Sequence, residues 1–319
     1  MDYKNGNGNH TGTIFKRKRK NYSRDDIVFY SILMIFPIAW FCVFYIGVNF
    51  NSLLLTFKNV DVATGTTTYT LFGNIKEALT RLSNESELLT AFGQSLLAYF
   101  VPLVIGTPLA LLFSYYIYKK MPMSKLFRVM LFMPSIISAI IMVVIFRFFA
   151  ESAVPEIIKM LTHQEKVQGL IENPNTRFGT IMFYNIWISF GVNCLMYVNA
   201  MNDIPPERVE AANLDGATGF REFWSISLPS VFSTLSTFLV AGVALIFTNQ
   251  FNLFSFFGSS APSGIMTYGY WLYRETLRTA NSPAQVPVVA AMGVCMTVVA
   301  VPLTLFVRWL LNKFGPSAD

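Results

Sequence analysis

Charged residues are scarce in this chain of 319 residues. They make up 13% of the sequence, about half of the roughly 25% typical of soluble globular domains. So few charges could not cover the surface of a soluble multidomain enzyme, and the 53% of hydrophobic residues excludes disorder. The three cysteines, Cys42, Cys194 and Cys295, are too few for a disulfide framework, and each lies in an apolar stretch. The composition therefore predicts a protein whose solvent is mostly lipid.

Groups that carry catalysis or bind metals are also missing from the sequence. The two histidines lie outside the apolar runs, and no cluster of His, Cys and acidic residues has the spacing of a metal site or a catalytic triad. A phosphate-binding P-loop is absent as well, because Tyr270 stands where the spacing from Gly264 to Gly269 would need a lysine. We therefore expect no enzymatic activity and no bound cofactor, so that any ATP would be hydrolysed by another polypeptide.

Six runs without Asp, Glu, Lys or Arg define the architecture, and a helix needs about 20 apolar residues to cross the hydrocarbon core. Five of these runs hold one span each. The sixth, residues 223–273, is rich in Asn, Ser, Gly and Pro in its second half, where we expect a loop or partly re-entrant segment. The sequence thus predicts an all-α integral membrane protein with six transmembrane helices, at 27–48, 93–118, 126–148, 179–200, 231–250 and 287–310.

The predicted organisation is one membrane domain with short ends. Residues 1–24 form a disordered, basic cytoplasmic N-terminus, residues 25–314 the six-span domain and residues 315–319 a short cytoplasmic tail. Lys and Arg gather on the side of both termini, which receives the whole net charge of +6. The basic run 16–20 could be a nucleic-acid arm, but it directly precedes a long apolar span. We interpret it as a topology anchor that faces anionic lipid, and we expect no nucleic acid among the partners.

The predicted spans hold almost no ionisable side chains. Arg147 and Arg308 lie at span ends, where a long side chain can reach the interface. Proton-driven carriers usually keep ionisable groups in mid-membrane, so their absence argues against proton coupling. A sodium-coupled carrier that uses carbonyls and hydroxyls stays open as an alternative.

The segment between the fourth and fifth predicted spans, residues 201–230, is long for a connection between helices. Two prolines end the preceding helix, and residues 207–214 favour a new one with acids in its first turn. Gly216 and Gly219 permit a sharp reversal before a second amphipathic stretch at 220–228. The pattern predicts helix, glycine turn, helix, which is either a hairpin on the membrane surface or a docking lever for a soluble partner.

The spacing of residues within this segment resembles a known signature. Seven positions match the EAA signature of permease subunits of binding-protein-dependent ABC importers: Glu210, Ala211, Ala212, Gly216, Ile226, Leu228 and Pro229. The resemblance covers roughly residues 25–315 and is strongest to carbohydrate-uptake permeases of the maltose and glycerol-phosphate type. It implies a type I ABC importer permease fold, in which the loop 201–230 carries a cytoplasmic coupling helix.

The resemblance also implies partners and residue roles. It implies an ABC ATPase dimer that meets this loop, a second permease subunit in a heterodimer, an extracellular solute-binding protein and a sugar substrate, in a bacterial cytoplasmic membrane. The resemblance assigns coupling to the ATPase to Glu210, Ala211, Ala212 and Gly216. We add Leu214, Phe220 and Phe223 as candidates for an apolar docking face.

Polar side chains on the fourth predicted span indicate a substrate path. Asn185, Ser189 and Asn193 recur at a spacing of four, close to one helical face, and polar groups in spans tend to face a cavity. In maltose-type permeases an Asn-x-Trp at this distance before the loop borders the sugar site, and Asn185 and Trp187 match it. Asn249, at the outer end of the fifth predicted span, is a further candidate. Amides and aromatic rings bind sugars, although interhelical hydrogen bonds and an aromatic belt would use the same residue types.

The expected cargo is an oligosaccharide or a related sugar. A phosphate cargo would favour cationic groups in the path, and none lies in the middle of a predicted span. Glycerol-phosphate or a polyol is kept as the alternative cargo, and an ion-coupled secondary carrier as the alternative class of protein.

Overall fold

The computed structural model describes residues 23–61, 66–163 and 166–316 of the chain. Almost all of the predicted basic N-terminus, and most of the predicted C-terminal tail, therefore lie outside the described residues. The chain divides into two units, residues 1–52 and 53–319, and each is described by itself.

The described part of the first unit is a single apolar helix. It begins at a capping box, in which the Ser23 backbone N–H donates to the Asp26 carboxylate at 3.1 Å. α1 (Arg24–Trp40), a π-helical stretch η1 (Phe41–Gly47) and α2 (Val48–Thr56) follow without a break, and α2 runs on into the second unit.

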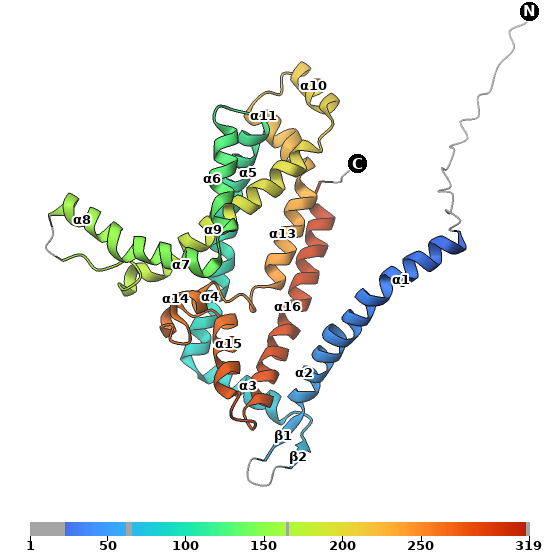
Figure 1. The fold of residues 1–319 in the computed structure, drawn as a ribbon, viewed down its shortest axis with the longest axis vertical. Helices are drawn as coiled ribbons and strands as arrows, with labels where there is room; N and C mark the ends of the chain where they lie inside the picture. Colours follow the sequence, from blue (N-terminus) through green and yellow to red (C-terminus); the bar gives the residue numbers. More distant parts are fainter. Residues whose placement is uncertain (1–22, 62–65, 164–165, 317–319) are drawn as a thin grey trace, which may run out of the picture. The chain divides into compact units, whose positions relative to one another are not determined.

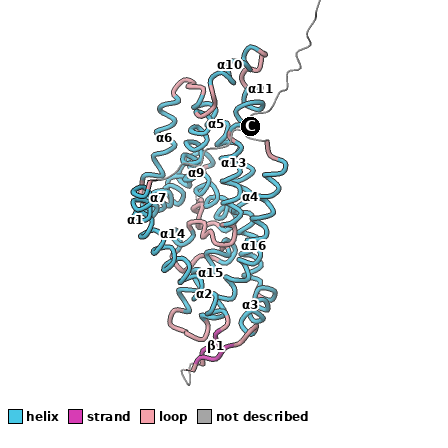
Figure 2. The backbone as a smooth tube through the Cα atoms, turned by 90° about the vertical axis from the view of Figure 1, so that its right-hand side faces the viewer, coloured by secondary structure: helices cyan, strands magenta, loops and turns pink. Residues whose placement is uncertain are grey.

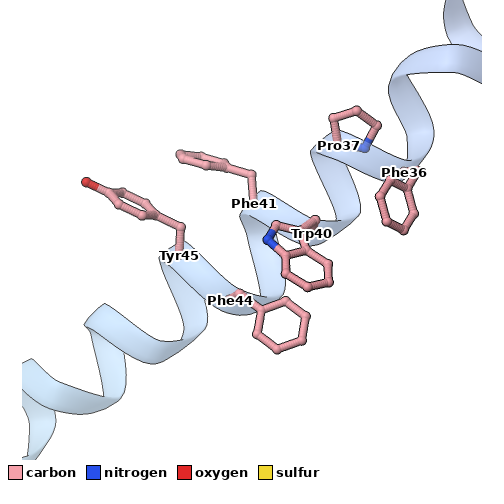
Figure 3. A pocket seen from close by; sticks show the side chains of 6 residues that line it. All are labelled: Phe36, Pro37, Trp40, Phe41, Phe44 and Tyr45. Carbon is pink, nitrogen blue, oxygen red and sulfur yellow. The ribbon is translucent and has the colours of Figure 1, made fainter. Parts of the chain in front are cut away.

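Aromatic side chains cover this helix and line an apolar hollow on it (Figure 3). The Trp40 and Phe44 rings stand 4.3 Å apart and the Phe41 and Tyr45 rings 4.9 Å apart, as expected for residues one turn apart. No residue of α1 or η1, both of which are fully described, is buried by protein. A helix that is apolar on all sides and has no protein core fits a lipid environment.

The second unit is a helical bundle with one small hairpin, in which β1 (Lys58–Val60) pairs antiparallel with β2 (Thr67–Tyr69). Its first helices are α3 (Gly73–Asn84), α4 (Ser86–Val101), η2 (Pro102–Gly106), α5 (Thr107–Tyr118), α6 (Ser124–Ile136), α7 (Ala139–Phe148), η3 (Phe149–Ala153), α8 (Val154–Thr162) and α9 (Pro174–Asn202). The later helices are α10 (Pro206–Leu214), α11 (Phe220–Glu222), η4 (Phe223–Ser227), α12 (Leu228–Ser230), α13 (Phe232–Ala244), α14 (Leu253–Phe257), η5 (Ser263–Ile265), α15 (Tyr268–Thr279) and α16 (Val286–Phe314). Figures 1 and 2 both place α10 and α11 at one end of this unit and α3 at the opposite end.

Among the described residues, four helices are long and apolar enough to cross a membrane: Arg24–Thr56, Ser86–Tyr118, Pro174–Asn202 and Val286–Phe314. They contain the predicted spans 27–48, 93–118, 179–200 and 287–310. Two further spans arise if each of two bent helix pairs crosses once, which gives six. The predicted all-α class with six transmembrane helices is therefore confirmed, with the hairpin as a small addition.

The predicted span at 126–148 is sharply bent. α6 ends at Ile136, and the following helix turns away from it by 105°. Ile137 and Ser138 take extended backbone angles at the break. Pro134 weakens the helix just before this point, because a proline cannot donate a hydrogen bond to the carbonyl four residues earlier.

The predicted span at 231–250 extends too far at its C-terminal end. α13 stops at Ala244, and the segment before it, Phe220–Ser230, is bent away from it by 63°. Residues 245–252 are irregular, and the expected loop that follows contains the short α14 and the three-turn α15. The sequence does not show where α13 ends, because the apolar run continues past Ala244 to Phe247.

Three clusters of buried side chains hold the second unit together. One joins α4, α7, α9 and α14, where the Tyr184 and Phe256 rings meet at 5.0 Å. A second joins α3, α4, α15 and α16, where the Tyr268 hydroxyl donates to the Met292 carbonyl at 3.2 Å. The third joins α5, α9 and the segment after α9, around Tyr197. α4 and α9 each belong to two clusters, and together they link all three.

The contact between α9 and α6 depends on a glycine. At Gly191, an added Cβ atom would overlap the carbonyl group of Leu131 on α6. Small residues allow such close backbone approach between membrane helices. On the same helix, Gly179 has open space around its Cα.

We therefore expect Gly191→Ala to push α6 away from α9 and to destabilise the protein by about 1–3 kcal/mol, the usual cost of overpacking. Thermal unfolding of the detergent-solubilised chain measures this loss. Gly179→Ala, on the same helix, is the matched control and should melt like the wild type or slightly higher. Equal melting of the two variants would contradict the assigned contact.

Candidate functional site

The loop between α9 and α13 has the predicted helix, glycine turn, helix form. α10 begins at Pro206, a position where proline needs no hydrogen-bond partner for its missing N–H. Gly216 and Gly219 both have positive φ, at +75° and +58°, which glycine adopts without steric cost. The chain then turns into α11 and the π-helical stretch η4. Both glycines are thus required by the backbone path of this loop.

Most of α10 stands away from the rest of the second unit. Within this fully described helix, Ala212 is the one buried residue, and Glu210 and Ala211 are exposed. A groove of about 1120 Å³ lies beneath α10, between it and the ends of α13 and α16, and Arg208 and Lys313 are among its lining residues. One side of the helix is therefore free to meet another molecule.

Two of the three residues predicted for an apolar docking face are exposed. Leu214 and Phe220 are 89% and 65% exposed, whereas Phe223 is 5% exposed and packs edge-to-face on the Tyr115 ring at 5.2 Å. Phe223 therefore belongs to the interior and not to an exposed face. Trp224, which the sequence reading missed, is 56% exposed, with its ring 6.0 Å from that of Phe220. Its position four residues after Phe220 could have predicted this exposure, since residues one turn apart share a helical face.

A small cavity of about 210 Å³ lies between α4, α9 and α13, and Ser189 and Asn193 are among its lining residues. Tyr99 lines it from α4 and donates a hydrogen bond to the Leu239 carbonyl on α13 at 3.2 Å. Gly242 makes room for the Tyr99 ring, which an added Cβ would approach to 2.7 Å. Among the described residues that line this cavity, none carries a charge, and hydroxyl and amide groups supply its polarity.

The other three predicted path residues lie elsewhere. Trp187 packs in the apolar cluster beside α7, with its ring 6.2 Å from that of Phe146. Asn249 is exposed just after α13, and its side-chain oxygen accepts a hydrogen bond from the Phe251 N–H at 2.9 Å. Asn185 lies on α9, and its side chain is hydrogen-bonded to the break between α13 and α14. The five predicted residues therefore do not form one site.

The break between α13 and α14 is strained and is held by side chains. Phe251 and Asn252 both have a φ of 56°, which is rare for residues other than glycine and most unusual for a bulky one. The Asn185 amide donates to the Phe251 carbonyl at 3.1 Å and to the Ile181 carbonyl at 2.9 Å, and its oxygen accepts from the Asn252 amide at 2.7 Å. These bonds use both donors and one acceptor site of Asn185, which identifies it as a structural partner of the break.

The position of the break is also set by α15. The Thr267 hydroxyl, just before α15, donates to the Asn249 carbonyl at 2.8 Å. This hydrogen bond ties the irregular segment after α13 to the start of α15. At Gly269, an added Cβ would lie 2.6 Å from the Thr248 carbonyl oxygen, so no larger residue fits there. α9 and α15 thus hold the same irregular segment from two elements.

Comparison with known proteins identifies the chain's relatives. The family model described as "Binding-protein-dependent transport system inner membrane component" matches residues 103–316, which include the loop with α10. "Probable ABC transporter permease protein YesP" of Bacillus subtilis is 25% identical over 310 residues, 92% of this chain and 93% of the relative. "Multiple sugar-binding transport system permease protein MsmF" of Streptococcus mutans is 22% identical over 79% of this chain and 87% of the relative.

Other matches cover the relative less fully or share only the fold. "Maltose/maltodextrin transport system permease protein MalF" of Escherichia coli is 25% identical over 174 residues, which are 54% of this chain but 33% of that protein. A chain from the crystal structure of a bacterial ABC transporter involved in the import of alginate, an acidic polysaccharide, superposes with a TM-score of 0.75. That match covers 91% of this chain and 96% of the other at 20% identity, and it shows a shared fold.

The role assigned to Asn185 can be tested with a double-mutant cycle. Asn185→Leu and Asn252→Leu should each destabilise the protein by about 1–3 kcal/mol, because each leaves buried polar groups without partners. The double variant should lose less than the sum, since both residues share one hydrogen bond. Thermal unfolding in detergent measures all four proteins. Wild-type stability of Asn185→Leu would contradict this structural role.

Proposed function

This chain belongs to the family of binding-protein-dependent transport system inner membrane components, and on that premise we propose that it is the permease subunit of an ATP-driven sugar importer. The observation that carries the proposal is the exposed α10, with Glu210 on its surface and Gly216 in the turn that follows. In this reading α10 is the coupling helix, and a separate ATPase dimer binds it. The ATPase supplies the energy, and this chain forms half of the translocation path.

The surface around α10 has the character of a protein-binding site. Leu214, Phe220 and Trp224 are large, apolar and more than half exposed, at the end of the second unit that carries α10 and α11 (Figure 1). Exposed apolar groups of this kind, with polar residues around them, mark interaction surfaces. Glu210 adds a charge that gives the contact specificity. The buried Ala212 fixes the helix on its other side.

The expected cargo is a neutral oligosaccharide. The sugar-named relatives MsmF and MalF support a sugar, and the uncharged cavity with Ser189 and Asn193 offers hydroxyl and amide groups suited to its hydroxyls. The transporter with the similar fold imports an acidic polysaccharide, and such a cargo would favour cationic groups. The described lining residues of this cavity include none, which also disfavours glycerol-phosphate.

The cavity is too small to be a complete passage. Its volume of about 210 Å³ falls below the roughly 300–1,000 Å³ of ordinary ligand pockets. A passage for an oligosaccharide therefore needs a second permease subunit, as in a heterodimer, and movement of the helices that line the cavity. An extracellular solute-binding protein would deliver the sugar, and the similar transporter was crystallised with its pentasaccharide-bound periplasmic protein. We place both termini and α10 on the cytoplasmic side of a bacterial membrane.

The coupling role of α10 can be tested by charge reversal. Glu210→Lys should weaken binding of the ATPase by about 2 kcal/mol, a typical loss for a central interface residue. Gly216→Leu should have a similar effect, because its φ of +75° strains any larger residue although the space around it is open. Copurification of the ATPase with the tagged chain measures binding, and accumulation of labelled neutral oligosaccharides measures uptake.

The matched control for charge is Glu156→Lys, an equal change at an exposed position on α8. It should leave copurification and uptake unchanged. Normal uptake in both loop variants, or failure of the wild-type chain to retain any ATPase, would overturn the proposed function.

The cargo site can be tested separately from coupling. Asn193→Leu removes an amide from the cavity and should raise the KM for sugar uptake while ATPase copurification stays normal. Asn199→Leu is the control, since Asn199 is exposed on the same helix and does not line the cavity. An unchanged KM in Asn193→Leu would place the sugar elsewhere.

A further inference from the structure

A partly buried ion pair, in which the Lys119 side chain is 31% exposed, joins the loop of α10 to the end of a long membrane helix. Glu222 is the last residue of α11, and its side chain is 2% exposed. Lys119 follows the last residue of α5, 103 positions earlier, and its Nζ donates to both carboxylate oxygens of Glu222 at 2.8 Å. The two residues therefore form a close contact between segments that are far apart in sequence.

Three further contacts, all made by Tyr115, strengthen this junction. The Tyr115 hydroxyl, one turn earlier on α5, donates to the Gly219 carbonyl at 2.9 Å. Its ring also packs edge-to-face on Phe223, and the Lys119 ammonium lies 5.9 Å from the centre of the Tyr115 ring. The last turn of α5 thus holds residues 219–223 through an ion pair, a hydrogen bond and ring packing. These contacts fix the second half of the loop, in contrast to α10, which stands over a groove.

Stability alone does not account for this ion pair. Removing the Glu222 carboxylate from water is costly, and a well-packed apolar residue of similar volume often stabilises a protein at least as well. The pair does impose one geometry, because the buried Glu222 carboxylate cannot lose the Lys119 ammonium without a large penalty. The pair therefore suits a contact that has to keep two elements moving as one body.

The elements that this pair connects both reach the small cavity. α5 continues from α4 through η2 as one helix, Ser86–Tyr118, which lines the cavity with Tyr99 and Thr107. In the other direction, residues 223–230 lead along the chain into α13, which lines it with Leu239. Movement of the loop reaches α13 through the covalent chain, whereas it reaches α5 through side-chain contacts.

We propose that Lys119 and Glu222 are positioning residues that make α5 follow the coupling loop, so that two walls of the cavity move together when the ATPase closes. This inference rests on the function proposed above. Without the ion pair, α10 would still bind the ATPase, but its movement would reach α13 alone. ATP would then be hydrolysed without a matching movement of sugar.

The test uses the full complex, purified through the tagged chain with its copurifying ATPase and reconstituted into proteoliposomes. Glu222→Gln keeps the shape of the side chain and removes its charge, and Lys119→Met keeps an unbranched chain without the ammonium. Each should lower the amount of sugar moved per ATP by about tenfold, within the usual range of coupling between sites. ATPase copurification should stay at the wild-type level. The sugar is the labelled neutral oligosaccharide that the wild-type complex accumulates.

Two further variants separate coupling from general damage. Glu77→Gln breaks an ion pair of 2.6 Å with Arg81 on the exposed face of α3 and should leave the sugar-to-ATP ratio unchanged. The exchange of charges, Lys119→Glu with Glu222→Lys, should restore much of the ratio, although an acid at the end of α5 is unfavourable to the helix dipole. If the single variants fail to fold, the exchanged pair should restore both folding and coupling.

The outcomes distinguish the two proposals. A wild-type complex that retains no ATPase or moves no sugar overturns the proposed function. A wild-type ratio in both single variants overturns the inference about the ion pair and leaves the proposed function standing. An exchanged pair that folds but stays uncoupled also overturns the inference.

Discussion

In a bilayer, every backbone N–H and C=O group needs a partner within the protein, and the rest of this structure depends on that requirement. The long helices satisfy it internally, which is why Ser86–Tyr118 and Pro174–Asn202 run almost without interruption. Irregular backbone then survives only where side chains or neighbouring elements supply partners. At the break after α13, Asn185 and Thr267 provide them, and the strained angles at Phe251 and Asn252 persist because several contacts fix the same segment.

The same requirement separates the parts that are rigid from the part that can meet a partner. α9 lies in two buried clusters and approaches α6 through Gly191, so the centre of the second unit is closely packed. α10 lies at the end of the unit with one buried residue, while Glu222 fastens the next turn of the loop to α5. A loop that is free on one side and fixed on the other can receive a force and pass it inward. This arrangement agrees with the role proposed for the family's coupling loop.

Much of the fold could be predicted from the sequence, because the absence of charge over a helix length is a local property. The helix and glycine turn around Gly216 were also predictable, since proline and glycine act on their own backbone. The bend after Ile136 and the end of α13 were not, because apolar composition continues through both. The site was harder still: Phe220 and Phe223 look alike in sequence, and only the position of Tyr115 on α5 decides that Phe223 is buried. The hydrogen-bond partners of Asn185 could not be predicted either, because they lie in the break after α13, and the sequence does not show where that break begins.

The small buried surface of α10 has a consequence for how the complex would assemble. A helix of nine residues is marginal in water on its own, because forming its first turn is unfavourable and few bonds follow. Among the residues of this helix, only the buried Ala212 and the partly buried Val209 pack on the rest of the unit, so part of its order has to come from the molecule that binds it. Ordering on binding lowers the affinity for a given contact area. A contact made by this helix would then be readily reversible.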